Sequence, residues 1–323
     1  MTASLNSLHC SWRAIAAARR LAGLLSALFV AVLLVGCATP PQQFNSPEAA
    51  VDSLIAAARA DNHKELDRIL GSDAKEVLSS GDKVADANAR AEFVRKFDEQ
   101  HALVADGDGA MILEVGNNGW PLPIPVVKGT DGWYFDTAAG ADELLSRRIG
   151  RNELDAIQVC LAICDAQREY AASDFTGDGW REYAQKFRSD AGKKNGLYWP
   201  SAPGEPDSPL GELVAGATAE GYFSGGSNRP QPFHGYYYRI LSAQGPAAPG
   251  GAMNYVASGH MIGGFAVVAW PAEYANSGLK TFIVNHQGVV YQRDLGDDTE
   301  AIAKGMKEFN PDAGWEPCGA LIQ

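Results

Sequence analysis

The sequence predicts an α+β fold made of two successive domains, each with helices first and a small antiparallel sheet after them. Two observations favour this class. Apolar residues recur three and four positions apart in the segments that we expect to form helices. Short apolar runs bounded by glycine-containing turns come after these segments. Helices and strands that are segregated along the chain in this way are typical of α+β domains.

The first domain is expected over residues 46–145. Ser46, Pro47 and Glu48 supply an N-cap, a first-turn proline and a first-turn acid, so a helix should begin there. Two more helices follow, and then three strands separated by Asn-Asn-Gly and Thr-Asp-Gly turns. The residues that mark the buried faces of the helices are Val51, Leu54, Ile55 and Ala58, then Leu66, Ile69 and Leu70, then Phe93 and Phe97. The expected strands are residues 110–115, 122–127 and 133–136.

The second domain is expected over residues 150–315, and it opens with a long helix over residues 150–173. The apolar face of this helix consists of Leu154, Ile157, Leu161 and Cys164, which are spaced three and four apart. A short helix over residues 210–219 comes before the strands. The expected strands are residues 235–243, 261–269, 280–285 and 289–293. We therefore predict a long helix that packs on a four-stranded antiparallel sheet.

The N-terminal segment has the features of a bacterial lipoprotein signal peptide. Three arginines give a positive region, and residues 21–36 form an apolar core that is too short for a comfortable membrane-spanning helix. The core ends in Leu-Val-Gly directly before Cys37, and this pattern resembles the lipobox of bacterial lipoproteins. We expect residues 1–36 to be a signal peptide, Cys37 to carry lipid, and residues 37–45 to form a tether.

Lipid on Cys37 would fix the location of the protein. Several acyl chains, such as palmitate, on one residue give durable membrane attachment, whereas a single chain binds only marginally. Ala38 follows the cysteine, so the aspartate that usually retains lipoproteins in the inner membrane is absent. We expect a cell-envelope protein that is anchored to the outer membrane and faces the periplasm.

The charge of the chain argues against nucleic acid as a partner. Removal of residues 1–36 takes away three of the 27 basic side chains and none of the 39 acidic ones, which leaves a formal charge of about −15. An acidic protein is repelled by the phosphate backbone. About 287 residues remain, and this length is enough for two modest domains with hydrophobic cores.

Three cysteines besides Cys37 remain after processing, in a compartment where disulfides persist. Cys160 and Cys164 lie one turn apart on the expected helix, so a bridge between them would strain its geometry. We therefore expect Cys318 to pair with Cys160 or with Cys164. A metal site at these cysteines is less favoured, because no histidine or further cysteine stands at ligand spacing nearby.

Long segments of the chain resemble one known family. They are SPEAAVDSL, WPLPIPVVKGTDGWYFDTAAG, RRIGRNELDAIQVC, DAQREYAASDFTGDG, GLYWPS, YYYRILSAQGPAAPGG and IGGFAVVAWPAEYANSG. Together they resemble the bacterial family catalogued as domain of unknown function 2950, over about residues 44–315. The resemblance implies a secreted lipoprotein without an established activity. Within that family, the second half is also similar to the globular part of type IV pilins, and the first half is similar to nuclear-transport-factor-like or cystatin-like folds.

Known catalytic motifs give little support for an enzyme. Ser72 and Lys75 match the Ser-x-x-Lys pattern of penicillin-binding proteins, but a pattern this short arises by chance in a few hundred residues. Its companion motifs are missing, and no nucleophile elbow, zinc-protease helix or phosphate-binding loop occurs. We assign no catalytic residue.

An acidic loop that begins at Asp174 suggests a calcium site. Asp174, Thr176, Asp178 and Glu182 offer oxygen atoms at alternating positions near glycines, as in the first half of a calcium-binding loop. The match is incomplete, because the position of the closing bidentate acid is occupied by Gln185. The alternative is a turn stabilised by aspartate side chains, and we favour it.

Aromatic residues are frequent in the second domain and suggest a ligand groove. Tyr198, Trp199, His234, Tyr236 and Tyr238 could line a groove for a glycan or a peptide. Alternation along the expected strand instead places Tyr236 and Tyr238 on one buried face, and we favour this interpretation as core.

Three hypotheses about function follow. The leading one is a non-enzymatic, lipid-anchored envelope protein without a cofactor that acts by binding or assembly, through contacts with envelope proteins or surface polymers. The second is an envelope enzyme that acts on cell-wall material. The third is an assembly module that is stabilised by calcium.

Overall fold

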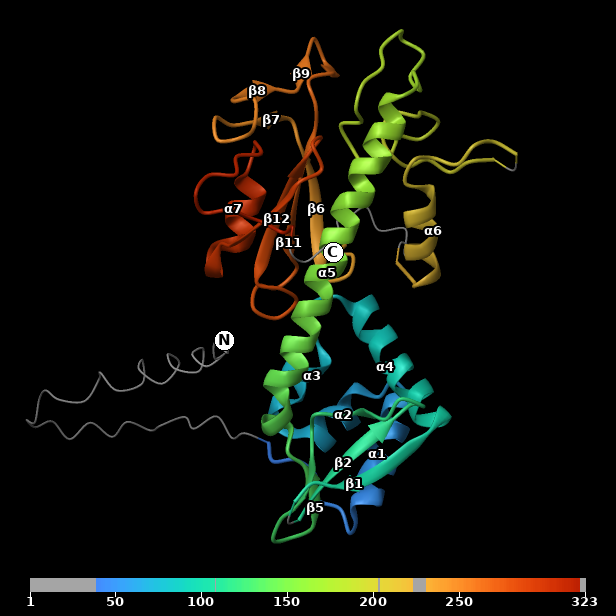
Figure 1. Cartoon of the computed structure of the whole chain (residues 1–323). Coiled ribbons are helices and arrows are strands. Elements are labelled where there is room, and N and C mark those ends of the chain that lie inside the picture. Colours follow the sequence, from blue (N-terminus) through green and yellow to red (C-terminus); the bar gives the residue numbers. More distant parts are fainter. Residues whose placement is uncertain (1–38, 108, 203, 223–230, 320–323) are drawn as a thin grey trace, which may run out of the picture. The chain divides into compact units, whose positions relative to one another are not determined.

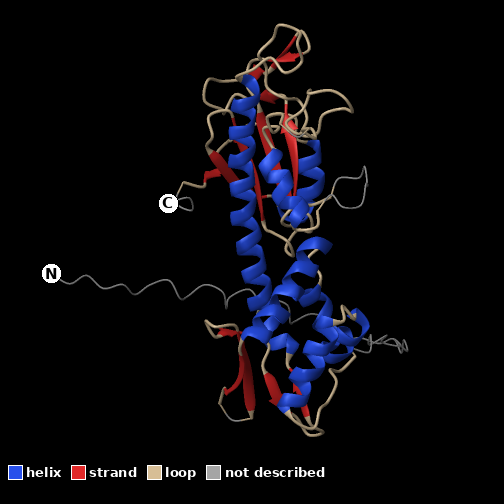
Figure 2. Cartoon of the chain, turned by 90° about the vertical axis from the view of Figure 1, so that its right-hand side faces the viewer, coloured by secondary structure: helices blue, strands red, loops and turns tan. Residues whose placement is uncertain are grey.

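The computed structural model describes residues 39–107, 109–202, 204–222 and 231–319. Every pairing between its named strands is antiparallel, and helices and sheets both occur in each half of the described chain (Figures 1 and 2). The expected α+β class is therefore confirmed. The expected signal peptide, the lipidation site Cys37 and the first residue of the tether after it lie outside the described residues.

The first half contains four α-helices and a small sheet. The helices are α1 (Pro47–Arg59), α2 (His63–Leu70), α3 (Ala74–Leu78) and α4 (Lys83–Glu99). The strands are β1 (His101–Ala105), β2 (Ala110–Val115), β3 (Trp120–Pro121), β4 (Val126–Lys128) and β5 (Trp133–Phe135), in the order β1-β2-β4-β5 with β3 paired to β2. As expected, Ser46 begins α1, and its side chain accepts a hydrogen bond from the amide of Ala49 at 3.2 Å.

The helices of this half pack on the sheet and bury a first hydrophobic core. Its members include Val51, Leu54 and Ile55 of α1, Leu66 and Ile69 of α2, and Leu113, Val126 and Phe135 of the sheet. The apolar faces expected for the first two helices are thus buried. The strand expected over residues 122–127 is shorter than predicted: only residues 126–128 pair as β4, while the preceding segment bends and contributes Leu122 and Ile124 to the core.

The long helix α5 (Thr137–Ala171) is the main correction to the sequence prediction, which started it at Gly150. Asp136 caps the helix and accepts a hydrogen bond from the amide of Ala139 at 3.3 Å. Gly140 lies within this helix. A Cβ at position 140 would come within 2.6 Å of the carbonyl oxygen of Pro123, so a larger side chain would clash there. Glycine therefore allows α5 to approach the chain segment between β3 and β4.

The second half places α5 beside a sheet of five strands in the order β14-β13-β12-β11-β6 (Figure 1). These strands are β6 (Tyr236–Leu241), β11 (Ala266–Pro271), β12 (Lys280–Asn285), β13 (Val290–Asp294) and β14 (Glu316–Pro317). The helices are α6 (Gly211–Ala219) and α7 (Thr299–Gly305), and short strands form two further pairs: β7 (Ala243–Gln244) with β8 (Met253–Asn254), and β9 (Val256–Ala257) with β10 (His260–Met261). The sheet therefore has one short edge strand more than predicted.

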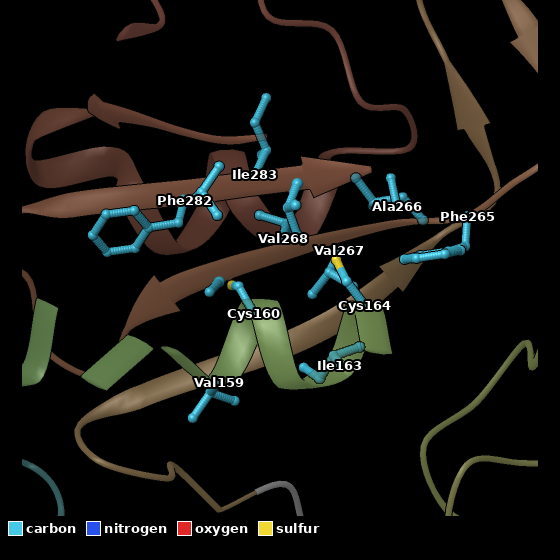
Figure 3. Close-up of a cluster of buried hydrophobic side chains, with 14 of the residues drawn as sticks. Val159, Cys160, Ile163, Cys164, Phe265, Ala266, Val267, Val268, Phe282 and Ile283 are labelled. Atoms are coloured by element: carbon cyan, nitrogen blue, oxygen red, sulfur yellow. The ribbon is translucent and has the colours of Figure 1, made fainter. Parts of the chain in front are cut away.

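A second hydrophobic core covers both faces of this sheet, and α5 packs on one of them (Figure 3). From α5 come Val159, Cys160, Ile163 and Cys164, and from the sheet and the residue before it come Phe265, Val267, Val268, Phe282 and Ile283. All six residues of β11 are buried. A central strand that is covered on both faces cannot show alternation, which explains why sequence periodicity placed it about five residues too early.

The two expected domains have separate cores but share α5. Leu144, near its start, packs against the first core, whereas residues 156–170 contribute to the second. Residues from Ala38 onward form a single compact unit. A division between residues 145 and 150 therefore falls within a continuous helix.

A buried carboxylate joins the two halves away from α5. Asp82, which is 1% exposed, caps α4 by accepting hydrogen bonds from the amides of Val84 and Ala85 with one oxygen. Its second oxygen accepts from the Tyr222 hydroxyl at 2.8 Å and from the Gly235 amide at 2.9 Å. Burial and the Asp82 carboxylate raise the pKa of Tyr222, so the phenol remains a donor.

We predict that Asp82→Ala lowers the free energy of unfolding by at least about 3 kcal/mol, because it removes a helix cap and leaves two further buried donors without an acceptor. The shift in the urea midpoint at unchanged slope measures this loss. Asp142→Ala on the exposed face of α5 is the matched control and should change stability by less than about 0.5 kcal/mol. Equal effects of the two substitutions would contradict the role assigned to Asp82.

Candidate functional site

An apolar pocket of about 340 Å³ lies in the first half of the chain, between α4 and the beginning of α5. Its apolar walls are Leu54, Ala58, Leu66, Leu70, Val77, Leu78, Phe93, Trp120, Leu122, Ile124 and Leu144. Small-molecule sites commonly measure about 300–1,000 Å³ and are mostly apolar with a few polar groups. The pocket therefore has the size and the surface of a site for a small ligand.

Basic side chains outnumber acidic ones around this pocket. Five basic residues line it, namely Arg90, Lys96, Arg147, Arg148 and Arg151, against the two acids Asp86 and Glu92. The whole chain has the opposite sign, with a formal charge of −12. Arg90, Arg147 and Lys96 form ion pairs with Asp61, Glu143 and Glu92. The positive charge that remains at the pocket therefore comes mainly from Arg148 and Arg151.

Three of the arginines lie on one stretch of α5. The guanidinium of Arg147 lies 5.4 Å from the centre of the Trp120 ring, close enough for a cation–π contact, and it also pairs with Glu143. Arg151 is exposed, and in the described part of the chain no ion pair or hydrogen bond of its side chain is found. Its charge is thus available to a ligand.

Arg148 forms no salt bridge among the described residues, although the carboxylates of Asp86 and Glu273 act on its charge. Its guanidinium donates to the carbonyl oxygens of Val77 and Ser79 and, at 2.6 Å, to the side-chain oxygen of Asn276. Burial lowers the pKa of Arg148, but an arginine guanidinium remains protonated in proteins. The direct hydrogen-bond acceptors of this guanidinium are thus neutral oxygens that hold it in place.

Arg90 offers one further donor. The side chain is 13% exposed and pairs with Asp61 at 2.8 Å, while its Nη1 atom is buried and has no hydrogen-bond partner among the described residues. An unsatisfied buried donor is costly unless a bound group accepts from it. The arrangement can therefore hold an apolar body and an anionic head group.

Sequence reasoning did not predict this pocket. The segment RRIGR, residues 147–151, was a visible signal because it places two arginines four positions apart on one helix face. The apolar walls, however, come from segments dispersed between residues 54 and 144. They become a pocket only when the first half has folded.

The residues of the expected aromatic groove do not line one hollow. Tyr198 and Trp199 face α6 across an open hollow of about 590 Å³, and the remaining three residues are not among its walls. Tyr236 is fully buried, and its hydroxyl donates to the carbonyl oxygen of Lys280 at 2.9 Å. Tyr238 packs against the second core. These contacts are those of core side chains.

His234 is held apart from that hollow by its own contacts. Its Nε2 atom lies 2.7 Å from Glu220, its Nδ1 atom lies 3.8 Å from Asp155, and its ring stacks on Phe233 at 4.1 Å. With these partners, the ring is fixed at the surface between α5 and the end of α6.

The expected calcium ligands separate into two groups. Asp174 accepts hydrogen bonds from the amides of Gly177 at 2.7 Å and Gly179 at 2.8 Å, and from the Thr176 hydroxyl at 3.3 Å. These bonds lower the pKa of Asp174. Asp174 and Thr176 thus stabilise the turn, which is the alternative favoured from the sequence, whereas Asp178 and Glu182 lie next to His260. No local motif indicated this histidine, which lies about 80 residues further along the chain.

The structure does not contain the expected disulfide. Cys160, Cys164 and Cys318 are all buried free thiols. Burial raises the pKa of Cys160, raises that of Cys164 to about 12 and raises that of Cys318 to about 11. The Ser-x-x-Lys residues also make no catalytic pair: the Ser72 hydroxyl donates to Asp73 at 3.4 Å.

The folded chain is thus an α+β protein with two hydrophobic cores, one shared helix and an apolar pocket with a basic rim. It matches the family model described as Protein of unknown function (DUF2950) over residues 41–318, and it belongs to this family. The expected membership of this family is therefore confirmed. No curated protein and no solved structure matches the chain. Within the described residues, no helix has both the length and the apolar character needed to cross a membrane.

We predict that the three buried cysteines are unreactive in the native protein. At pH 8 a thiol with a pKa of 11 or 12 is a thiolate to about one part in a thousand or less, and only the thiolate attacks an aromatic disulfide reagent. Residues 38–323, secreted into an oxidising compartment, should show no reactive thiol when native and three per chain in denaturant. One thiol in denaturant would instead demonstrate the disulfide expected from the sequence.

Proposed function

We propose that this protein is a lipid-anchored envelope protein that binds a small amphiphilic anion in the pocket between α4 and α5. The observation that carries this proposal is the combination of an apolar cavity of about 340 Å³ with an excess of basic side chains at its rim. An acyl chain that ends in a carboxylate or a phosphate has the matching chemistry. Its chain would contact Leu54, Phe93 and Ile124, and its head group would face the arginines of α5.

Two interactions would stabilise the bound ligand: the burial of its apolar chain and the hydrogen bonds of its anionic head group to guanidinium groups. Each methylene group that leaves water for an apolar wall contributes about 0.8 kcal/mol, and guanidinium groups recognise carboxylates and phosphates through paired hydrogen bonds. Arg148 is held rigidly by three protein oxygens, so little side-chain entropy is lost when an anion binds to it. Binding, without chemical conversion of the ligand, is the activity that these side chains support.

The envelope location rests on the N-terminal sequence. The positive region, the apolar core and the small residue before Cys37 support lipid attachment at this cysteine, and Ala38 supports the outer membrane as the destination. We propose that the protein faces the periplasm.

The second half supports a separate role in this proposal. The order of its elements, a long helix followed by an antiparallel sheet, supports the resemblance to the globular part of type IV pilins that we expected from the sequence. We propose that this half makes the contacts with other envelope proteins or with surface polymers.

The anchor can be tested with one substitution in the full-length chain. We predict that the wild-type protein sediments with bacterial membranes and that its mature N-terminal peptide begins at an acylated Cys37, as mass spectrometry would show. Cys37→Ser should abolish acylation and release the protein from the membrane, because no second lipid remains. Cys10→Ser is the control, since this residue lies in the part removed, and it should behave as wild type. Acylation that persists in Cys37→Ser would contradict the proposal.

The pocket can be tested with three probes of equal chain length, namely dodecanoate, dodecyl phosphate and dodecanol. The two anions are kept below their critical micelle concentrations and dodecanol is kept below its solubility limit. We predict saturable binding of the two anions to residues 38–323 by calorimetry. Arg151→Ala should weaken both anions about fivefold, or ~1 kcal/mol, and should leave dodecanol unchanged. Phe93→Ala should weaken all three probes, since it removes apolar wall.

Salt and a control variant complete this test. Added salt should weaken the anions and not the alcohol, because it screens only the charged interaction. Arg168→Ala lies on the same helix outside the pocket and should change nothing. Binding that is insensitive to both Arg151→Ala and Phe93→Ala, or no binding of any probe, would refute the pocket as the site.

A further inference from the structure

Three ligand-type side chains converge on the surface of the second half, far along the chain from the pocket. Asp178, Glu182 and His260 each offer one atom, and these atoms all lie within 4.8 Å of one another. Nδ1 of His260 lies 3.2 Å from Oε2 of Glu182 and 4.0 Å from Oδ2 of Asp178. Ligand atoms bound at about 2.0–2.2 Å to one metal ion are roughly 3–4 Å apart, so these separations suit a shared ion.

The backbone fixes this geometry from two distant segments. The amide of Tyr183 donates to the carbonyl oxygen of Met261 at 2.8 Å, and the side chain of Gln185 donates to the carbonyl oxygen of Gly259 at 2.7 Å. The amide of Met261 in turn donates to Oε2 of Glu182 at 3.0 Å. Residues 182–185 are thus joined to β10 by hydrogen bonds on both sides of His260.

The preceding turn presents Asp178. Asp174 binds the amides of Gly177 and Gly179, whose φ angles of +75° and +89° favour glycine. Oδ1 of Asp178 accepts from the amide of Trp180 at 3.0 Å, and its other oxygen, Oδ2, is directed to the histidine side. The turn at residues 174–179, which we favoured over a calcium-binding loop, therefore holds the Asp178 carboxylate in position beside His260.

The histidine nitrogen at the centre of this cluster lacks an ordinary partner. Nδ1 of His260 is buried and makes no hydrogen bond of acceptable geometry among the described residues, although Glu182 is 3.2 Å away. In the same part of the chain, no lysine or arginine forms an ion pair with Asp178 or Glu182. Among the described residues, His260 is therefore the one side chain that can carry positive charge beside these two carboxylates.

We propose that Asp178, Glu182 and His260 bind one divalent transition-metal ion, with zinc as the probe. Imidazole nitrogen combined with carboxylate oxygen suits zinc and its neighbours, whereas calcium takes six to eight oxygen atoms. Asp174 and Thr176 are engaged in the turn and cannot complete an oxygen shell. Three protein ligands leave a fourth position for water or for a group of another molecule. This inference is independent of the pocket and of its proposed ligand.

The site contains its own spectroscopic reporter. The indole of Trp180 stacks on the ring of His260, with 4.8 Å between the ring centroids and 22° between the planes. A paramagnetic ion that is bound to His260 lies close enough to this indole to quench its fluorescence. Trp180→Phe identifies the part of the quenching that comes from this residue.

The experiment uses the full-length chain in a non-chelating detergent, stripped of metal with EDTA. Zinc calorimetry should show one saturable site per chain, and cobalt should quench the Trp180 fluorescence until zinc displaces it. Asp178→Asn and His260→Gln should each weaken zinc at least about tenfold, since even partners outside the ligand shell commonly matter this much. Asp178 is the more exposed of the two, so its variant should fold normally by circular dichroism.

The matched control is His63→Gln, which alters an exposed histidine that also lies beside an aspartate, at 3.5 Å. It should bind zinc as wild type does. Zinc affinity that is unchanged in both site variants would overturn the proposal. The same holds for cobalt quenching that persists in Trp180→Phe, and for calcium binding that is tighter than zinc and insensitive to His260→Gln.

Discussion

The continuity of α5 is the constraint on which the arrangement of the described chain depends. Its 35 residues span about 52 Å at 1.5 Å per residue, and its two ends serve different cores. Because a helix is stiff, the first half cannot turn freely about the second. Asp82 strengthens this connection at another point, since one buried carboxylate holds α4 together with Tyr222 and Gly235.

Both candidate sites take their positions from the same helix. Three of the four arginines of the pocket lie on α5 between residues 147 and 151. The turn that presents Asp178 begins three residues after α5 ends. The two sites are therefore separated by most of the helix. A ligand in the pocket would contact the first half of this rigid helix, and an ion at His260 would lie beyond its C-terminal end, so neither would contact the other.

Local sequence signals predicted the elements that local contacts determine. The start of α1 at Ser46 follows from its cap, and β2 and β12 match their expected bounds, because their apolar residues pack as the pattern requires. The start of α5 was wrong because glycine at positions 140 and 150 lowers helix propensity. The close approach of Gly140 to Pro123 is a tertiary contact, and the helix propensity of a residue takes no account of such contacts.

The candidate sites were predictable only in part, for the same reason. Two acids of the metal cluster stood out by their spacing, but His260 joins them through the pairing of two distant segments. The pocket has no sequence signal apart from RRIGR, since its walls come from helices and a strand that meet only in the fold. The aromatic residues suggested a ligand groove from the sequence alone, but Tyr236 and Trp199 are buried and fill the core. Large aromatic side chains are frequent in both settings, so their presence does not distinguish a groove from a core.

The sign of the charge at the pocket finally limits what the pocket can bind. The chain as a whole is acidic, so a long polyanion would be repelled over most of its length. At physiological salt, however, charges act over only about 8 Å, and within that distance the rim of the pocket is basic. A ligand with a single charge at one end interacts with the basic rim and is too far from the other acids to be repelled by them. Its apolar part is also buried in the pocket, whereas the backbone of an anionic polymer would remain in water. Local charge and apolar volume therefore act together in favour of a small amphiphile over an anionic polymer.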